Sequence, residues 1–415
     1  MSRRRVVVTG LGCVSPVGNT VEESWANLIA GQSGIGPITQ FDAANFSCKI
    51  AGEVRGFAIE DYIPEKEARH MDRFIHLGMA AACQAVADSG LPTGDALGED
   101  AAVRIGCNIG AGIGGLPMIE QTHAELVSRG PRRISPFFVP ASIINMISGH
   151  ISIKYGFKGP NIAVVTACTT GLHAIGLSGR MIEYGDADVM VAGGAEAAIS
   201  PLGIGGFASA RALSTRNDDP KTASRPWDKD RDGFVLGEGG GVLVLEEYEH
   251  AKARGARIYA ELAGFGMSAD AYHMTAPDID GPRRSMIIAL RNAGINVDQV
   301  DYLNAHGTST PLGDLNETNA IKAAFGDAAG KLVVNSTKSM TGHLLGGAGG
   351  IESVFSVLAV HQQKSPPTIN IFSQDPECDL DYCANTARDM KIEVAVKNNF
   401  GFGGTNGTLV FKRLR

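Results

Sequence analysis

The chain has 415 residues, of which 44% are hydrophobic and 20% are charged. This length and this balance exclude a disordered chain and allow two sizeable hydrophobic cores. The net charge of −7 gives no overall attraction to nucleic acid or to an anionic membrane surface, so we expect neither as a partner.

Short apolar runs rich in β-branched residues recur along the chain, and each ends in glycine or a small polar residue. Their apolarity is continuous rather than alternating, which predicts strands that are covered on both faces. In chain order the predicted strands are Val6–Thr9, Val103–Ile109, Asn161–Thr166, Asp188–Ala192, Gly241–Leu245, Ile258–Leu262, Asp301–Ala305, Leu332–Asn335, Ala395–Asn398 and Thr408–Phe411.

Helices are predicted between these strands, and a glycine follows three of them, as is typical of the residue just after a helix end. Alternating strands and helices predict an α/β fold with a largely parallel sheet. The best division falls at Gly255, which gives two packed domains, residues 1–255 and 256–415, because no Pro/Ser-rich tether separates them. The predicted helices are His76–Ser89, Thr169–Tyr184, Glu246–Arg254 and Gly349–His361.

The most informative motif is Gly159–Gly171, in which a predicted strand runs directly into Cys168 and a helix begins immediately after it. A thiol at a helix N-terminus faces unpaired backbone N–H groups and the positive end of the helix dipole. We therefore expect the pKa of Cys168 to lie below that of free cysteine, and we interpret Cys168 as a nucleophile. The alternative reading, a small buried hydrophobic residue, is accepted for Cys13, Cys83 and Cys107.

Two histidines and a lysine follow further predicted strands. His306 follows one of them, and Lys338 and His343 follow the next, inside a glycine-rich turn. Ligands of open α/β sheets gather outside the carboxyl ends of strands, so we expect these side chains to lie near Cys168. A single histidine is usually structural, but this combination favours a catalytic site.

Three other glycine-rich segments need an interpretation. The glycines of Asn398–Gly407 let backbone N–H groups converge on an oxyanion or simply form a hairpin, and the sequence does not decide between the two. Val6–Pro16 and Gly110–Gly115 are partial matches to the dinucleotide-binding fingerprint. The first has Ser15 in place of the third glycine and lacks the acidic residue expected about 20 residues later, so a nucleotide-dependent oxidoreductase is a weak alternative.

The cysteines and the N-terminus indicate the compartment. The seven cysteines are scattered, with no CxxC and no Cys/His metal spacing, which predicts a reducing environment and no metal site. No apolar segment of a secretory signal precedes the first strand, and the uncharged stretches 134–153 and 159–179 contain too many polar residues and prolines to span a bilayer. We expect a cytoplasmic protein without a cofactor.

The motifs Thr-Ala-Cys-Thr-Thr-Gly around Cys168, His-Gly-Thr-Ser-Thr from His306 and Lys-Ser-Met-Thr-Gly-His from Lys338 together resemble the β-ketoacyl-acyl-carrier-protein synthases, and the resemblance covers essentially the whole chain. The Cys–His–His set is similar to that of the elongating long-chain (second) type of bacterial fatty-acid synthesis, and differs from the Cys–His–Asn set of initiating synthases and the Cys–His–Cys set of thiolases. The resemblance implies a thiolase-like fold, with two related halves in a five-layered αβαβα arrangement, and a homodimer. No duplication is visible in the residues themselves.

The resemblance also implies a reaction, the decarboxylating Claisen condensation of malonyl-acyl carrier protein with an acyl group, which gives 3-oxoacyl-acyl carrier protein. Cys168 would hold the acyl group as a thioester, and neutral His306 and His343 would donate hydrogen bonds to the malonyl thioester oxygen as CO₂ leaves. The backbone N–H groups of Cys168 and Phe402 would hold the oxyanion.

Supporting residues follow from the same resemblance. Lys338 would act through its fixed charge, paired with Glu352, and the stretch Asp270–Thr275 corresponds to a mobile loop of the family. The residues implied in binding the pantetheine arm and the acyl chain are Thr308, Thr310, Ile113 and Phe402.

Acyl carrier protein is acidic, so the resemblance gives the local basic residues a role in docking the acyl- and malonyl-loaded carrier. The uncharged stretch Ile134–Ile153 would lie near the dimer interface. Two alternatives share the fold: a polyketide ketosynthase, which has the same Cys–His–His set, and a non-catalytic chain-length factor, which lacks the nucleophile. The sequence does not state the preferred acyl length. The candidate docking residues are Lys66, Arg69, Arg132, Arg133 and Arg211.

Overall fold

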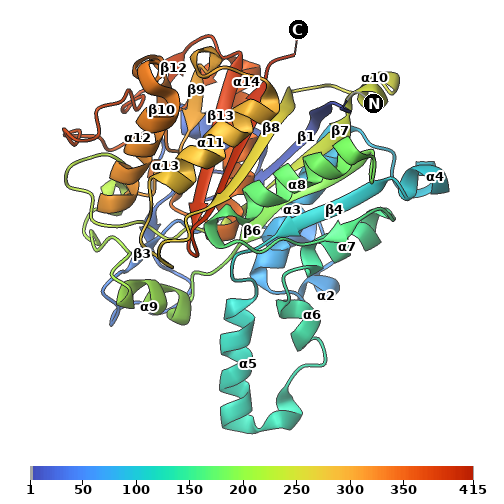
Figure 1. The fold of residues 1–415 in the computed structure, drawn as a ribbon. Helices are drawn as coiled ribbons and strands as arrows, with labels where there is room; N and C mark the ends of the chain where they lie inside the picture. The colour runs from blue at the N-terminus through green and yellow to red at the C-terminus, as the bar shows by residue number, and fades with distance from the viewer. Residues whose placement is uncertain (1–2, 415) are drawn as a thin grey trace.

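The computed structural model describes residues 3–414 and has a mixed α/β fold with a large central sheet (Figure 1). Ten strands form this sheet in the order β10-β9-β13-β14-β8-β1-β7-β6-β4-β5. Their bounds are β1 Val6–Val14, β4 Ile105–Gly110, β5 Asn161–Ile162, β6 Val189–Glu196, β7 Gly239–Glu247, β8 Ala260–Ala269, β9 Tyr302–Asn304, β10 Val333–Asn335, β13 Val394–Gly401 and β14 Thr405–Lys412. The short strands β2 Gly36–Pro37, β3 Ile50–Ala51, β11 Lys364–Ser365 and β12 Arg388–Asp389 form two small ribbons.

The helices cover this sheet and end where the sequence supplies glycine. Gly90 and Gly185 follow α3 and α8 with φ of 64° and 88°, the left-handed conformation expected of a glycine after a helix. The α-helices are α1 Val21–Ile29, α2 Glu65–Ala68, α3 Arg73–Ser89, α4 Glu99–Ala102, α5 Leu116–Arg129, α6 Phe138–Ser142, α7 Met146–Tyr155, α8 Thr170–Tyr184, α9 Pro201–Ser209, α10 Tyr248–Ala253, α11 Asp280–Ala293, α12 Pro311–Phe325, α13 Lys338–Thr341 and α14 Ala348–Gln362. Short 3₁₀ turns include η3 Pro131–Arg133, η4 Ala167–Thr169 and η8 Leu345–Gly347.

The two halves of the sheet repeat one topology. From the centre outward, the strands run β1-β7-β6-β4-β5 in one half and β8-β14-β13-β9-β10 in the other. In each half, the first two pairs are antiparallel and the next two are parallel. The antiparallel pair β1–β8 joins the halves. This repeat is the relation between two halves that the resemblance implies and that the residues do not display.

The sheet is mixed, so the prediction of a largely parallel sheet is wrong. Among the described residues, five of its nine strand pairs are antiparallel. An unbroken run of apolar residues indicates that both faces of a strand are covered. Helices cover these antiparallel strands as fully as the parallel ones, so the run looks the same in both. The pattern therefore identified buried strands but not their direction.

Three of the four hydrophobic clusters among the described residues lie between the sheet and the helices of five layers. One core lies between helix α3 and β1, β4, β6 and β7, and another between helices α11 and α12 and the second half of the sheet. The central core joins Leu172 and Ile175 of α8 to Ile351 and Phe355 of α14 and reaches Leu409 of β14. Helices α8 and α14 thus form the middle layer of an αβαβα arrangement, and the predicted fold class is confirmed.

Several element boundaries differ from the predicted ones. The strand expected over Asn161–Thr166 has only its first two residues in the sheet, and residues 163–166 lead irregularly into η4. Glu246 and Glu247 extend β7 instead of starting the next helix. Helices α5, α7, α11 and α12 were not predicted, and α5 projects from the body as part of an arm (Figure 1). The division at Gly255 lies between α10 and β8 and stays a prediction.

No helix among residues 3–414 is both long and apolar enough to cross a membrane.

The packing of α14 on the sheet depends on glycine. A Cβ added at Gly350 would lie 2.2 Å from the carbonyl oxygen of Gly241 in β7. Because the obstacle is backbone, we expect Gly350→Ala to lower the free energy of unfolding by about 3 kcal/mol. Urea denaturation measures this loss. Gly206→Ala in α9 is the control, since a Cβ there meets nothing within 4 Å, and equal stability losses in both variants would contradict this view of the packing.

Candidate active site

Cys168 lies in a sharp turn at the start of the central helix α8. The turn η4 carries it, and the preceding residue, Ala167, has φ of +50°, a region that residues with a side chain rarely adopt. Cys168 is half-buried, whereas the other six cysteines are buried. The strained turn therefore presents this one thiol at the end of the middle layer.

Burial dominates the acidity of this thiol. It raises the pKa of Cys168 well above the ordinary value, while the charge of Lys338 and the backbone N–H groups of Phe402 and Cys168 lower it. The prediction of a lowered pKa is wrong, because the position of a residue at a helix start does not show how completely its sulfur is enclosed. The resting group is a thiol.

His306 follows β9 and is held on both sides. Glu317 of α12 accepts hydrogen bonds from the backbone N–H groups of His306, at 2.9 Å, and Gly307, at 2.7 Å. The side-chain amide of Asn399 donates to Glu352 at 3.0 Å and lies 3.3 Å from Nδ1 of His306. Since that amide nitrogen is a donor, Nδ1 is the acceptor and the ring carries its proton on Nε2.

His343 has the same tautomer for a different reason. The backbone N–H of Leu345 donates to its Nδ1 at 3.3 Å, which leaves the proton on Nε2. The ring is 3% exposed, and its main chain is fixed by hydrogen bonds with Val235 and Gly237. The turn that follows is tight, with φ of +49° at Leu345.

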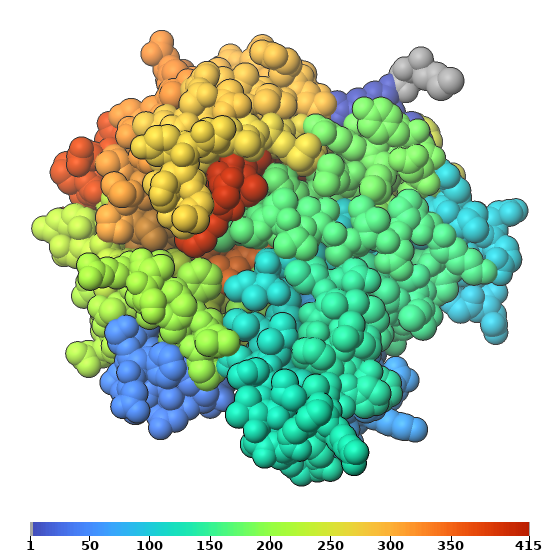
Figure 2. All heavy atoms as spheres, turned by 60° about the horizontal axis from the view of Figure 1, so that its bottom comes forward, coloured from blue at the N-terminus to red at the C-terminus, as the bar shows by residue number. Residues whose placement is uncertain are grey.

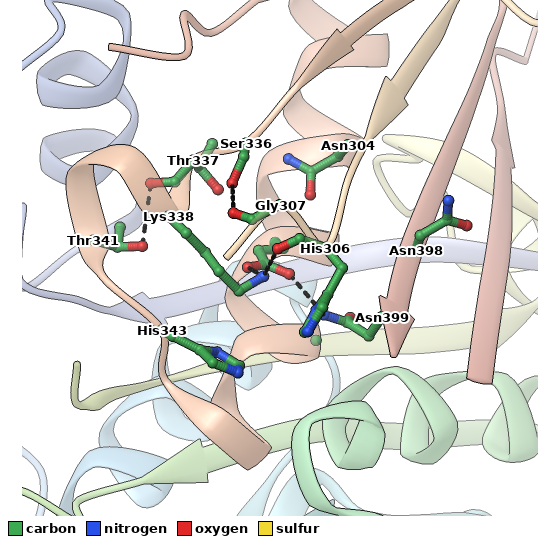
Figure 3. A network of polar contacts seen from close by, with 12 residues as sticks. Asn304, His306, Gly307, Ser336, Thr337, Lys338, Thr341, His343, Asn398 and Asn399 are labelled. Carbon is green, nitrogen blue, oxygen red and sulfur yellow. Dashed lines mark hydrogen bonds and ion pairs between the residues drawn. The ribbon is translucent and has the colours of Figure 1, made fainter. Parts of the chain in front are cut away.

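The two imidazoles form a neutral pair of donors. Their ring centroids are 5.2 Å apart and the rings are nearly perpendicular (Figure 3). Burial holds the pKa values of both His306 and His343 well below the ordinary range, and the charges of Lys338 and Lys397 lower them further. Both rings are therefore neutral at physiological pH, and each offers one N–H.

A buried ion network lies behind these rings. Glu352 of α14 pairs with Lys338 at 2.5 Å and with Lys397 of β13 at 2.8 Å, and each of the three side chains is at most 1% exposed. Lys338 also donates to the backbone carbonyl of His306 at 2.7 Å (Figure 3). Although burial opposes ionisation, the two ammonium groups hold the pKa of Glu352 below its usual value.

Hydrogen bonds connect the turn between β13 and β14 to the residues of the turn η4 around Cys168. Thr169 donates from its hydroxyl to the carbonyl of Thr405 at 3.0 Å, and Thr405 donates to the carbonyl of Thr166 at 3.1 Å. The N–H of Phe402 reaches the sulfur of Cys168. The segment Asn398–Gly407 forms a hairpin and also directs a backbone N–H at the thiol. The two roles considered for its glycines, forming a hairpin and supplying N–H groups to an oxyanion, are therefore compatible. Figure 2 shows this C-terminal turn, in red, within a hollow of the surface.

The glycine run after β4 surrounds a carboxylate of the protein itself. Glu196 of β6 accepts hydrogen bonds from the N–H groups of Gly112, Ile113, Gly114 and Gly346, at 2.7 to 3.1 Å. Burial raises the pKa of Glu196 to about 7 against the lowering effect of these donors. The run therefore ties the segment around Ile113 to the turn after His343, which is its structural purpose.

Of the other predicted residues, Thr308 is buried and the rest are half-buried or exposed. The hydroxyl groups of Thr308 and Thr310 are 3.0 Å apart. Ile113 is 38% exposed and Phe402 is 44% exposed. The five candidate docking residues are all exposed and lie on three elements: Lys66 and Arg69 in and just after α2, Arg132 and Arg133 in η3, and Arg211 after α9.

Sequence reasoning missed four buried polar residues of this site: Lys397, Asn399, Glu317 and Glu196. For one of them, Lys397, the sequence contains a signal that could have identified it. Lys397 lies inside the apolar run that was predicted as a buried strand, and a lysine in a buried strand requires a buried partner. The other three lie on separate elements, and no local pattern connects them to the histidines.

Comparisons with known proteins agree with this geometry. Residues 3–251 match the N-terminal domain of the β-ketoacyl synthase family and residues 259–372 match its C-terminal domain. Proteins named 3-oxoacyl-[acyl-carrier-protein] synthase 2 from Vibrio cholerae and Coxiella burnetii are 59% and 58% identical over the full length of both chains. A β-ketoacyl synthase structure from Burkholderia phymatum is 35% identical with a TM-score of 0.92, covering 99% of this chain and 100% of that one.

A second solved structure is a type II polyketide ketosynthase in complex with its acyl-carrier protein, 36% identical over the whole of both chains with a TM-score of 0.91. The chain belongs to the β-ketoacyl synthase family. Within that family it is a condensing enzyme of the acyltransferase class.

The raised thiol pKa predicts a specific alkylation profile. Below its pKa, a thiol gains thiolate about tenfold per pH unit, so the rate of Cys168 alkylation by iodoacetamide should rise steadily from pH 7 to pH 9. Mass spectrometry of the intact protein measures this rate. A plateau within that range would contradict the raised pKa. Lys338→Met should slow the reaction, because the ammonium group stabilises the thiolate.

Proposed function

We propose that this chain condenses malonyl-acyl carrier protein with an acyl group held as a thioester on Cys168, giving 3-oxoacyl-acyl carrier protein in fatty-acid elongation. The observation that carries the assignment of residues is the pair of neutral imidazoles, His306 and His343, each with an Nε2 proton that meets no acceptor among residues 3–414. Full-length relatives named 3-oxoacyl-[acyl-carrier-protein] synthase 2 support the reaction.

Acyl transfer to Cys168 is the first half-reaction. The sulfur attacks the thioester carbon of the acyl carrier, the carrier thiol leaves with the thiol proton, and the acyl group stays on the enzyme. The N–H groups of Cys168 and Phe402, which both address the sulfur in the resting enzyme, hold the oxyanion of this step. Loss of one such donor costs about 3–4 kcal/mol of transition-state stabilisation.

Decarboxylation and condensation follow. His306 and His343 donate their Nε2 protons in hydrogen bonds to the malonyl thioester oxygen, which accepts negative charge as the bond to CO₂ breaks. The carbon of the resulting enolate attacks the acyl carbon on Cys168. The new carbon–carbon bond forms, the sulfur leaves as thiolate, and a proton from solvent restores the thiol. Neutral rings suit this role, since the enolate oxygen needs donors and no proton needs to move.

Lys338 and the threonines complete the proposed site. Lys338 acts as a fixed charge that also holds the backbone carbonyl of His306, and Glu352 holds Lys338. Thr308 and Thr310 line the pantetheine path, Phe402 stands at its gate and Ile113 borders the acyl pocket.

The alternatives are weaker. In the dinucleotide-like run, a Cβ at Gly10 or Gly12 would lie 2.2 Å and 1.8 Å from carbonyl oxygens of α3, so these glycines serve helix packing inside β1. A chain-length factor would lack the nucleophile Cys168. A polyketide ketosynthase has the same Cys–His–His set, but the polyketide ketosynthase structure is only 36% identical, whereas the 3-oxoacyl synthase relatives reach 59%.

A homodimer is the proposed assembly. The arm α5–α7 exposes a group of apolar side chains that a single chain leaves uncovered, and the edge strand β5 offers unpaired backbone groups beside them. Exposed apolar residues of the arm include Ile119, Val127, Phe137, Val139, Ile143 and Ile153.

The halves 1–255 and 256–415 are the proposed domains, because the repeated topology divides between β7 and β8. The free thiols of all seven cysteines support a cytoplasmic location.

A mass-spectrometric experiment tests the reaction and the nucleophile together. Incubation with a long-chain acyl carrier protein should add one acyl group to Cys168, and malonyl-loaded carrier should then remove it with release of CO₂. Cys168→Ala should form no adduct and no 3-oxoacyl product, and Cys383→Ala, a buried cysteine, is the matched control. Product formation at the wild-type rate by Cys168→Ala would reject the assignment.

Charge reversal tests the docking residues. Arg132 and Arg133 lie in the exposed turn η3 of the arm, and acyl carrier protein is acidic, so the double change to Glu should raise KM for carrier-bound substrates at least tenfold. Free pantetheine thioesters, which lack the protein, should be used as before. Lys391→Glu, at another exposed position, is the control. An equal loss on both kinds of substrate would remove the docking role.

A further inference from the structure

Lys397 places a full positive charge inside the central sheet. It lies in β13 with its side chain completely buried, opposite Asn304 of β9 and Leu409 of β14. Its ammonium group pairs with Glu352 Oε2 at 2.8 Å and donates to the backbone carbonyl of Asn398. The reaction proposed above gives this lysine no task.

The charges around Lys397 do not cancel. Glu352 is one carboxylate shared by two ammonium groups, with Lys338 on Oε1 and Lys397 on Oε2. Glu317 of α12 is the other acidic group acting on Lys397, and it is occupied by the backbone of His306 and Gly307. Counting both lysines as protonated and Glu352 as ionised, these three groups carry one excess positive charge beside the two imidazoles, and burial, which raises the pKa of Glu317, weakens the acid that could offset it.

This excess acts on the histidines. The charge of Lys397 lowers the pKa values of His306 and His343, and Asn399, two residues further along the same face of β13, fixes the His306 tautomer while donating to Glu352 Oε2. Lys338 is the leading cation acting on all three groups, the Cys168 thiol and both histidines, whereas the charge of Lys397 acts on the histidines. Lys397 is therefore placed to affect one half-reaction and not the other.

We propose that Lys397 is a positioning residue for the decarboxylation step: its ammonium group anchors the Glu352 carboxylate and keeps His306 and His343 in the neutral, Nε2-protonated form. This inference rests on the proposed function, since it assigns a task within that reaction. A buried ion pair is weak evidence for a role in stability alone, because well-packed apolar residues in place of the whole pair are often neutral or stabilising.

The ammonium group of Lys397 itself loses its proton as the pH rises. Burial lowers its pKa to about 8; Glu352 and Glu317 raise it and Lys338 lowers it. Below that pH the ammonium form prevails and the histidines stay neutral. As the pH falls through their lowered pKa values, the rings become protonated and the pair loses its two-donor neutral form.

The test separates the two half-reactions. Acyl transfer to Cys168 is followed by mass spectrometry, and CO₂ release from malonyl carrier is followed on the acylated enzyme. In Lys397→Met the acid limb of CO₂ release should move to higher pH by about one unit, because removing a nearby positive charge raises the histidine pKa values. At a pH on that limb, the rate falls about tenfold, while acyl transfer keeps its wild-type rate.

Variants distinguish charge from packing. Lys397→Arg keeps the positive charge, so the acid limb of its CO₂ release should lie at the wild-type pH. Ethylammonium added to Lys397→Ala should restore the charge and move the acid limb back toward the wild-type pH. Lys397→Gln replaces Lys397→Met should the latter not fold. Lys412→Met, an exposed lysine on the neighbouring strand β14, is the matched control.

Two results would overturn the proposal: an unchanged acid limb in both uncharged variants, or equal slowing of acyl transfer and CO₂ release, which marks a purely structural role. Failure of the wild-type enzyme to release CO₂ would instead reject the proposed function, so the two failures are distinguishable.

Discussion

The site depends on one buried carboxylate shared by two ammonium groups. Glu352 holds Lys338 and Lys397 at 1% exposure or less, and it also accepts the amide of Asn399 that orients His306. Removing a partner from a buried ion pair leaves an uncompensated charge at a cost of several kcal/mol, so these side chains form one unit. The position of His306 depends on this unit, and its two ammonium groups add to the burial that keeps both imidazoles neutral.

The two related halves bring this unit to the nucleophile. Cys168 precedes α8 in the first half, and the His343 turn precedes α14 in the second, at corresponding places in the repeated topology. Since α8 and α14 pack against each other as the middle layer, their N-terminal ends meet, and the charge of Lys338 in the second half acts on the thiol of the first. Hydrogen bonds from Thr169 and Thr405 then fix the hairpin of β13 and β14 to the same point.

The sequence predicted the parts whose signal is local. His306 and Lys338 stand just beyond buried strands, and the glycines at 90 and 185 end helices as predicted, whereas the run before Cys168 is only partly buried. Strand direction was not predictable, because coverage by helices leaves the same apolar pattern in parallel and antiparallel strands. Glu196 and Glu317 were missed because each binds the backbone of a turn, and neither a carboxylate at the end of a strand nor one within a helix has a local pattern that shows this. The thiol pKa was predicted in the wrong direction because enclosure is a tertiary property.

Burial gives the site a consistent electrostatic state. The same loss of solvent that raises the pKa of the Cys168 thiol lowers those of His306 and His343, so all three reacting groups are uncharged at rest. In the proposed reaction, charge then develops on the substrate, as an oxyanion or an enolate that the backbone and imidazole N–H groups would receive, and on the sulfur only when it leaves as thiolate. Donors fixed in this way require no reorganisation when the charge develops, which is the main source of electrostatic catalysis in an enclosed site. An ionised thiolate at rest would compete with the substrate oxyanion for the N–H groups of Cys168 and Phe402, so a neutral thiol leaves those donors to the reaction.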